Sequence, residues 1–167
     1  MDVPELRITI TRRTDGGAVL RCVRADGTET WQHQRGRQAA FFPLHDLTHL
    51  SVESSLGFRR GFFGLIAEGW DIEDTGGKGE RGALPPEAAI VEHLVGSLDL
   101  ERAGTVHWTA ARLHAQASLF ATGRGLPSPP PLTDATLDHV RDRIRELHHR
   151  WIATPPGQTL ELSFDRR

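Results

Sequence analysis

The 167-residue sequence contains one cysteine and neither tyrosine nor asparagine. A single cysteine excludes an internal disulfide and favours a reducing compartment, so we expect a cytoplasmic protein. Cys22 falls in a predicted strand, where we interpret it as a small buried hydrophobic residue and not as a nucleophile. Residues 1–5 show no basic segment followed by an apolar one, which predicts the absence of a secretory signal.

The net charge is small, and long apolar runs are absent. The formal net charge of −2 provides no overall attraction to nucleic acid or to an anionic membrane. Nucleic-acid-binding motifs such as Cys/His fingers are absent, and no apolar run approaches the roughly 18 residues of a membrane span. All but one of the 20 basic residues are arginine, a bias that we attribute to the codon usage of a GC-rich bacterial genome. We therefore expect neither nucleic acid nor a membrane as a partner.

Several catalytic signatures are also missing. The chain contains no glycine-rich phosphate loop of the P-loop or dinucleotide type, and it contains no Gly-x-Ser-x-Gly elbow. The lone cysteine and the scattered serines do not form a recognisable nucleophile motif. Any chemistry must therefore come from other residue types.

Apolar and polar residues alternate near both ends of the chain, as expected for half-buried strands. Turn signals at residues 15–17 and 26–27 join the first three of these stretches into an antiparallel meander. A final alternating stretch near the C-terminus is expected to add an edge strand to that meander. The predicted strands are residues 6–14, 18–25, 28–34 and 159–164.

The middle of the chain has apolar residues at helical spacing. Residues 69–83 are rich in glycine and are typical of a surface loop or of a lid, and residues 123–131 are typical of a stiff connector. This order of elements predicts a single α+β domain, in which helices pack on one face of an antiparallel sheet of three to four strands. The predicted helices are residues 43–56, 62–68, 85–102, 105–122 and 134–152.

The first of these helices contains a metal-ligand pattern. His45 and His49 are four residues apart, so they lie one above the other on a helix and can share one metal ion. The five residues His45-Asp46-Leu47-Thr48-His49 resemble a variant of the H-E-x-x-H helix of the zincin metalloproteases, with Asp in place of Glu. This resemblance implies a zinc ion or another divalent metal at the two histidines, and Asp46 as the general base of a hydrolytic reaction.

Two histidines need a third protein ligand to hold zinc well. In the zincins that use glutamate, this ligand lies about twenty residues further on, and Glu68 is nineteen residues after His49. Glu53 is a second candidate, both as a ligand and as a proton acceptor, because it is one further turn along the same helix. Three residues further downstream remain open as ligands, namely Glu92, His93 and His114.

Arg59 and Arg60 precede a predicted helix start, where free backbone N–H groups and guanidinium groups together can bind an anion. Such a site would favour a phosphate or carboxylate substrate. The alternative interpretation is a solvated turn with two arginines that reflect codon usage.

Three functions follow as hypotheses. The first is metal-assisted hydrolysis of an unknown small-molecule or peptide substrate. The alternative is a non-enzymatic binding or oligomerisation module, for example a homodimer, in which the histidines are structural and the phenylalanines of residues 58–63 contact the partner. A third interpretation is a small-ligand pocket between the sheet and the helices, with the glycine-rich segment as its lid.

Overall fold

A computed structural model describes residues 3–166 and has an α+β fold built on an open, four-stranded antiparallel sheet. The strand order is β3-β2-β1-β4, so the closing strand adds an edge to the meander, as predicted, and the strand that it pairs with is the first. The strands are β1 (Leu6–Arg12), β2 (Ala18–Arg24), β3 (Glu29–Gln34) and β4 (Thr159–Phe164).

The sheet has one buried and one solvent-facing side, because apolar and polar residues alternate along its strands. In β1, Leu6, Ile8 and Ile10 are fully buried, whereas Arg7 between them is exposed. Cys22 of β2 pairs with Ile8 and is buried on the same side. Its burial confirms the interpretation of Cys22 as a core residue, and burial also raises the pKa of its thiol.

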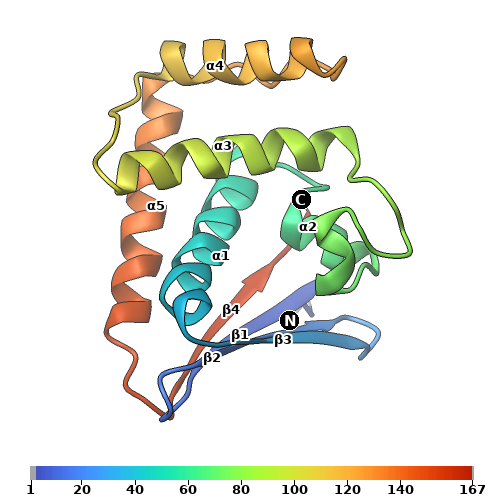
Figure 1. The fold of residues 1–167 in the computed structure, drawn as a ribbon, viewed down its shortest axis with the longest axis vertical. Helices are drawn as coiled ribbons and strands as arrows, with labels where there is room; N and C mark the ends of the chain where they lie inside the picture. Colours follow the sequence, from blue (N-terminus) through green and yellow to red (C-terminus); the bar gives the residue numbers. More distant parts are fainter. Residues whose placement is uncertain (1–2, 167) are drawn as a thin grey trace.

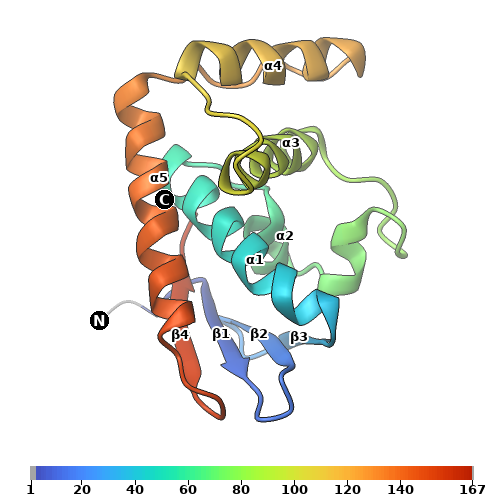
Figure 2. The same cartoon turned by 60° about the vertical axis from the view of Figure 1, so that its left-hand side comes forward.

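Helices cover the buried side of the sheet (Figure 1). They are α1 (Arg37–Leu56), α2 (Phe62–Glu68), the short 3₁₀ helix η1 (Ile72–Gly76), α3 (Pro86–Arg102), α4 (Ala110–Gly123) and α5 (Asp134–Ile152). Helix α1 packs against both α5 and α3, while α4 packs on α3 and lies farthest from the sheet (Figures 1 and 2). Within residues 3–166, no helix combines the length and the apolar character that crossing a membrane requires.

The central helix begins earlier than we predicted. We expected Pro43 in the first turn, but α1 begins at Arg37 and has Pro43 in its interior. Gly36, with a φ of 55°, makes the turn between β3 and the helix in a conformation that glycine adopts without strain. Residues 37–40 are good helix formers, so they extend the helix ahead of the proline, which removes only one backbone hydrogen bond.

Helix α4 begins later than predicted, at Ala110 and not at residue 105. The reason is a local cap, because the Thr109 side chain accepts a hydrogen bond of 3.2 Å from the backbone N–H of Arg112. The boundaries predicted for α2 and α5 are confirmed.

Leu50 of α1 tests the packing of α1 on the sheet, because its side chain is 1 % exposed within the core that the two share. We expect Leu50→Ala to lower the free energy of unfolding by about 2–5 kcal/mol, since it removes buried methyl groups and leaves a cavity. The control is Leu119→Ala on α4, where the side chain is 74 % exposed and the change should stay within about 0.5 kcal/mol. Urea denaturation measures both, and equal effects would contradict the assignment of the core.

Candidate metal centre

Two helices bring three potential metal ligands together. His45 and His49 lie one turn apart on the same side of α1, and Glu92 approaches them from α3. One potential ligand atom from each of the three residues lies within 4.8 Å of those of the other two. At this spacing a single ion can contact all three side chains, so His45, His49 and Glu92 form the candidate metal centre.

Each histidine of the centre has a carboxylate in contact with its Nδ1 atom. Nδ1 of His45 lies 2.7 Å from an oxygen of Asp99, and Nδ1 of His49 lies 3.2 Å from an oxygen of Glu53. An imidazole that donates its Nδ1–H to a carboxylate has Nε2 free to bind a metal, and its ring plane is fixed. Nε2 of His49 faces the third potential ligand, because it lies 3.1 Å from Oε1 of Glu92.

The electrostatics of the centre favour a positive charge at its middle. Burial alone would lower the pKa of His49, which is 1 % exposed, but the carboxylates of Glu53 and Glu92 outweigh burial and raise that pKa to about 10. Burial alone would raise the pKa of Glu92, but the hydrogen bond to His49 and the charge of that ring lower this pKa overall. A divalent cation can satisfy the same carboxylates while both histidines are neutral.

Glu53 connects the centre to the start of α2. Its buried carboxylate accepts hydrogen bonds from the backbone N–H groups of Phe63 (3.4 Å) and Gly64 (3.1 Å), in addition to its contact with His49. Because these N–H groups have no partner within α2, Glu53 caps that helix while it orients the imidazole. We predicted Glu53 as a proton acceptor at the metal, but the structure places it on the Nδ1 side of His49, away from Glu92.

Asp46 lies beside the centre and reaches toward the sheet. Its buried side chain accepts a hydrogen bond of 3.0 Å from Nε2 of Gln34 on β3. Burial raises the pKa of Asp46 to about 6, although the bond from Gln34 and the two histidines act in the opposite direction. Asp46 lines the same cleft as His45 and His49, so the structure brings the predicted base and the two predicted histidine ligands together.

This cleft has a volume of about 500 Å³ and opens onto the candidate metal centre. Strand β3, the helices α1, α2 and α3, and the glycine-rich segment that follows α2 all contribute to its walls. Phe42 and Phe62 supply aromatic surface, Ile72 and Leu84 supply aliphatic surface, and Glu73 supplies a carboxylate. A ligand in the cleft would therefore contact both the side chains of the candidate metal centre and apolar walls.

The predicted third ligand and the predicted anion site lie elsewhere. Glu68 accepts two hydrogen bonds of 2.9 Å from Arg60, its neighbour across α2, so its carboxylate is already balanced by a full charge. The charge of Arg60 is balanced by Glu68 in the same ion pair, and the backbone N–H of Arg59 donates a hydrogen bond to Glu87. Neither arginine lines the cleft, and the acid that the structure places beside the two histidines is Glu92.

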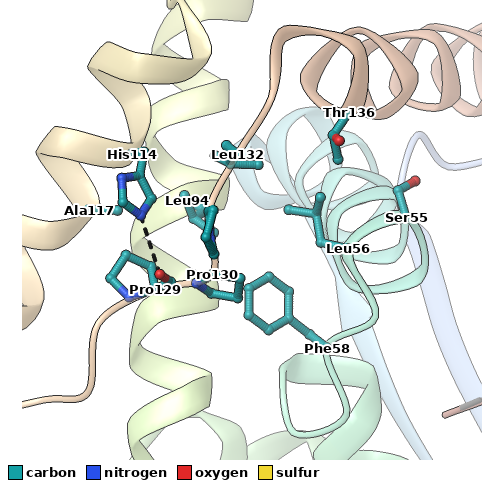
Figure 3. Close-up of a pocket in the computed structure, with 11 residues that line it drawn as sticks. Ser55, Leu56, Phe58, Leu94, His114, Ala117, Pro129, Pro130, Leu132 and Thr136 are labelled. Atoms are coloured by element: carbon teal, nitrogen blue, oxygen red, sulfur yellow. Dashed lines mark hydrogen bonds between the residues drawn. The ribbon is translucent and has the colours of Figure 1, made fainter.

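A second, smaller cavity of about 160 Å³ lies under the proline-rich connector, between α1, α3 and α4 (Figure 3). Its walls are mainly apolar and include Phe58 and Leu94. His114 is the ionisable side chain in these walls, and its Nε2 points to the carbonyl oxygen of Pro129 at 3.3 Å. His93, the other downstream option for a ligand, stacks on Phe120. Neither histidine belongs to the candidate metal centre.

The phenylalanines that we considered for partner contacts lie largely inside the protein. Phe58 is 6 % exposed and Phe63 is 1 % exposed, and both belong to hydrophobic cores. Phe62 is half-buried and lines the cleft. These side chains therefore stabilise the fold and shape the cleft, and they do not form an exposed docking surface.

The sequence alone leaves Glu92 as one of three downstream options and does not point to Asp99. One signal does connect these two acids, because they are seven residues apart on a predicted helix and so lie on the same side of it, two turns apart. The two histidines of α1 face this side of α3. Glu92 contacts His49, and Asp99 contacts His45.

Comparisons of the chain with protein-family models, with curated proteins and with solved structures found no match.

Gly61 tests the buried position of Glu53. A Cβ atom at Gly61 would lie 2.4 Å from the carboxyl carbon of Glu53, so Gly61→Ala must displace that carboxylate or the start of α2. We expect a loss of about 1–3 kcal/mol in the free energy of unfolding, measured by urea denaturation.

The matched control is Gly96→Ala on α3, where an added Cβ meets no atom within 4 Å outside its chain neighbours and its own helix backbone. This change should leave stability unaltered or raise it by about 0.5–1 kcal/mol, because alanine is the better helix former. If Gly61→Ala proved as stable as Gly96→Ala, the tight packing around Glu53 would be refuted.

Proposed function

We propose that the protein binds one divalent metal ion, zinc by preference, through His45, His49 and Glu92, and that it uses the ion for hydrolysis. The observation that favours this proposal most is the arrangement of the two histidines. Each has a carboxylate at Nδ1, and both lie within reach of a third acid. Carboxylate–histidine pairs of this kind orient the ligands of many protein metal sites.

The donor set fits zinc. Two imidazoles and one carboxylate are a ligand set of catalytic zinc sites, in which three protein ligands leave a position for water or substrate. Imidazole and carboxylate also suit other first-row divalent ions, so the metal that is bound in the cell depends partly on supply. A zinc ion in such a site lowers the pKa of a bound water toward neutrality and polarises a substrate carbonyl.

The surrounding residues have distinct roles in this proposal. Asp99 and Glu53 hold the ligand rings in place, and Glu53 also anchors α2 beside the centre. Asp46 accepts the proton that hydrolysis releases, since its carboxylate lines the cleft next to both histidines and Gln34 fixes its position. The half-buried phenylalanines Phe42 and Phe62 exclude water from one side of the cleft.

Metal content is the first test. Protein purified without an affinity tag or a chelator should contain about one zinc per chain by mass spectrometry, and His45→Ala and His49→Ala should each contain none. The control is His139→Ala on α5, which removes an exposed histidine and should leave the metal in place.

Glu92→Gln and Glu68→Gln distinguish the two candidates for the third ligand. We expect Glu92→Gln to weaken zinc binding at least about tenfold in a competition titration, and Glu68→Gln to leave it unchanged. The reverse pattern would restore Glu68 as the ligand. A wild-type protein without metal, together with histidine variants that fold normally, would refute the proposal and favour structural histidines.

Asp46→Asn separates the role of a base from that of a ligand. The amide keeps nearly the same shape and can still accept the hydrogen bond from Gln34, so we expect the metal content to be unchanged. Hydrolysis of the best substrate found by screening esters, amides and phosphoesters should fall about 10²–10⁴-fold. Full activity in Asp46→Asn would exclude Asp46 as the base, and loss of the metal would make it a ligand.

A further inference from the structure

We propose that the cleft beside the metal centre accepts a ligand with a protonated amine, and that Glu73 is the residue that selects it. This inference rests on the proposed function, because it concerns the ligand of the same site. It runs against the expectation of a phosphate or carboxylate substrate that Arg59 and Arg60 suggest in the sequence.

The charged side chains that line the cleft are acidic or are histidines. They are Asp46, Glu73 and Glu92, together with His45 and His49. In the part of the chain that the structure describes, no lysine or arginine lines this cleft. Apart from the metal centre, the cleft therefore offers no positive charge to an anionic ligand.

A count of charges gives the sign of the field in the metal-bound state. Asp46 and Glu92 together balance a divalent ion, and both histidines are neutral when they bind it. Glu73 then leaves the cleft with an excess of negative charge, and the buried carboxylate of Glu53 behind His49 adds to it. Such a cleft attracts cations and disfavours anions.

Glu73 differs from its acidic neighbours because its carboxylate is free. Asp71 pairs with Arg24 at 3.1 Å, and Asp74 accepts a hydrogen bond from the backbone N–H of Asp71. Among residues 3–166, Glu73 has no hydrogen-bonding or ion-pairing partner for its side chain. A carboxylate in this state at the rim of a cleft is available to a ligand.

The backbone around Glu73 is held in place. The preceding residue, Ile72, is 5 % exposed, and its N–H donates to Oγ1 of Thr30 on β3 at 3.0 Å. Asp71 and Asp74 form a capping box at the start of η1. The carboxylate of Glu73 therefore projects from a fixed turn and not from a freely moving loop.

The apolar walls suit the same kind of ligand. Phe42 and Phe62 line the cleft, and aromatic faces attract an ammonium group. Ile72 and Leu84 offer aliphatic surface for the carbon chain that connects the amine to the group at the metal. The chemical class is thus an amine attached to a hydrolysable or metal-binding group.

Metal-binding hydroxamates with different ends test the inference on the zinc-loaded protein. Three six-carbon compounds bind the metal through the same hydroxamate group and differ only at the other end of the chain, which is a methyl group, an amine or a carboxylate. By calorimetry we expect the amine to bind about three- to tenfold more tightly than the methyl compound, and the carboxylate to bind more weakly. Added salt should reduce the preference for the amine, because Glu73 is exposed to solvent.

Variants of Glu73 assign the preference to this residue. Glu73→Gln should abolish it without changing the affinity of the methyl compound, and Glu73→Lys should favour the carboxylate. The matched control is Glu80→Gln, which removes an exposed acid of the same segment that does not line the cleft. A tighter carboxylate compound, or an amine preference that survives in Glu73→Gln, would overturn the inference while the metal centre stands.

Two further arms identify the source of the amine. A short peptide hydroxamate with a free N-terminus is compared with its acetylated form, which lacks the charge. A preference for the free peptide assigns the amine to a peptide N-terminus, whereas a preference confined to the short compounds assigns it to a small amine. Failure of the protein to load zinc at all would overturn the proposed function and this inference together.

Discussion

The buried contact between Glu53 and His49 is the constraint on which the candidate centre depends. A carboxylate is costly to bury unless every oxygen is satisfied, and here the imidazole and two backbone N–H groups of α2 satisfy it. The contact therefore orients His49 and fixes the start of α2 at the same time. It also explains why residue 61 is a glycine, since a side chain there would collide with the carboxylate.

The packing of α1 against α3 gives His45, one turn before His49, a carboxylate partner of its own. Asp99 holds His45 as Glu53 holds His49, while Glu92 completes the set from the same side of α3 as Asp99. Three acids around two histidines would repel one another without a positive charge among them. That charge is supplied by His49 itself, whose pKa is raised to about 10, or by a divalent cation that takes its place.

The centre lies where the sheet edge, three helices and the glycine-rich segment meet. Strand β3 contributes Gln34, which holds Asp46, and Thr30, which anchors η1 and thereby Glu73. The sheet thus positions two of the acids that face the cleft, although the potential metal ligands all lie on helices. Helices and sheet thus both hold the side chains that face the cleft.

The sequence by itself determined the elements whose pattern is local. Alternation in β1 predicts its buried face, and helical spacing predicts that His45 and His49 share one side of α1, because both periods follow from backbone geometry. Only the tertiary structure decided which acid meets these histidines. Glu68 has the spacing of the zincin ligand, but Arg60, just ahead of α2, binds it, whereas Glu92 reaches the centre because α3 packs against α1. Contacts between helices depend on how whole faces pack, and no local period in the chain encodes that choice.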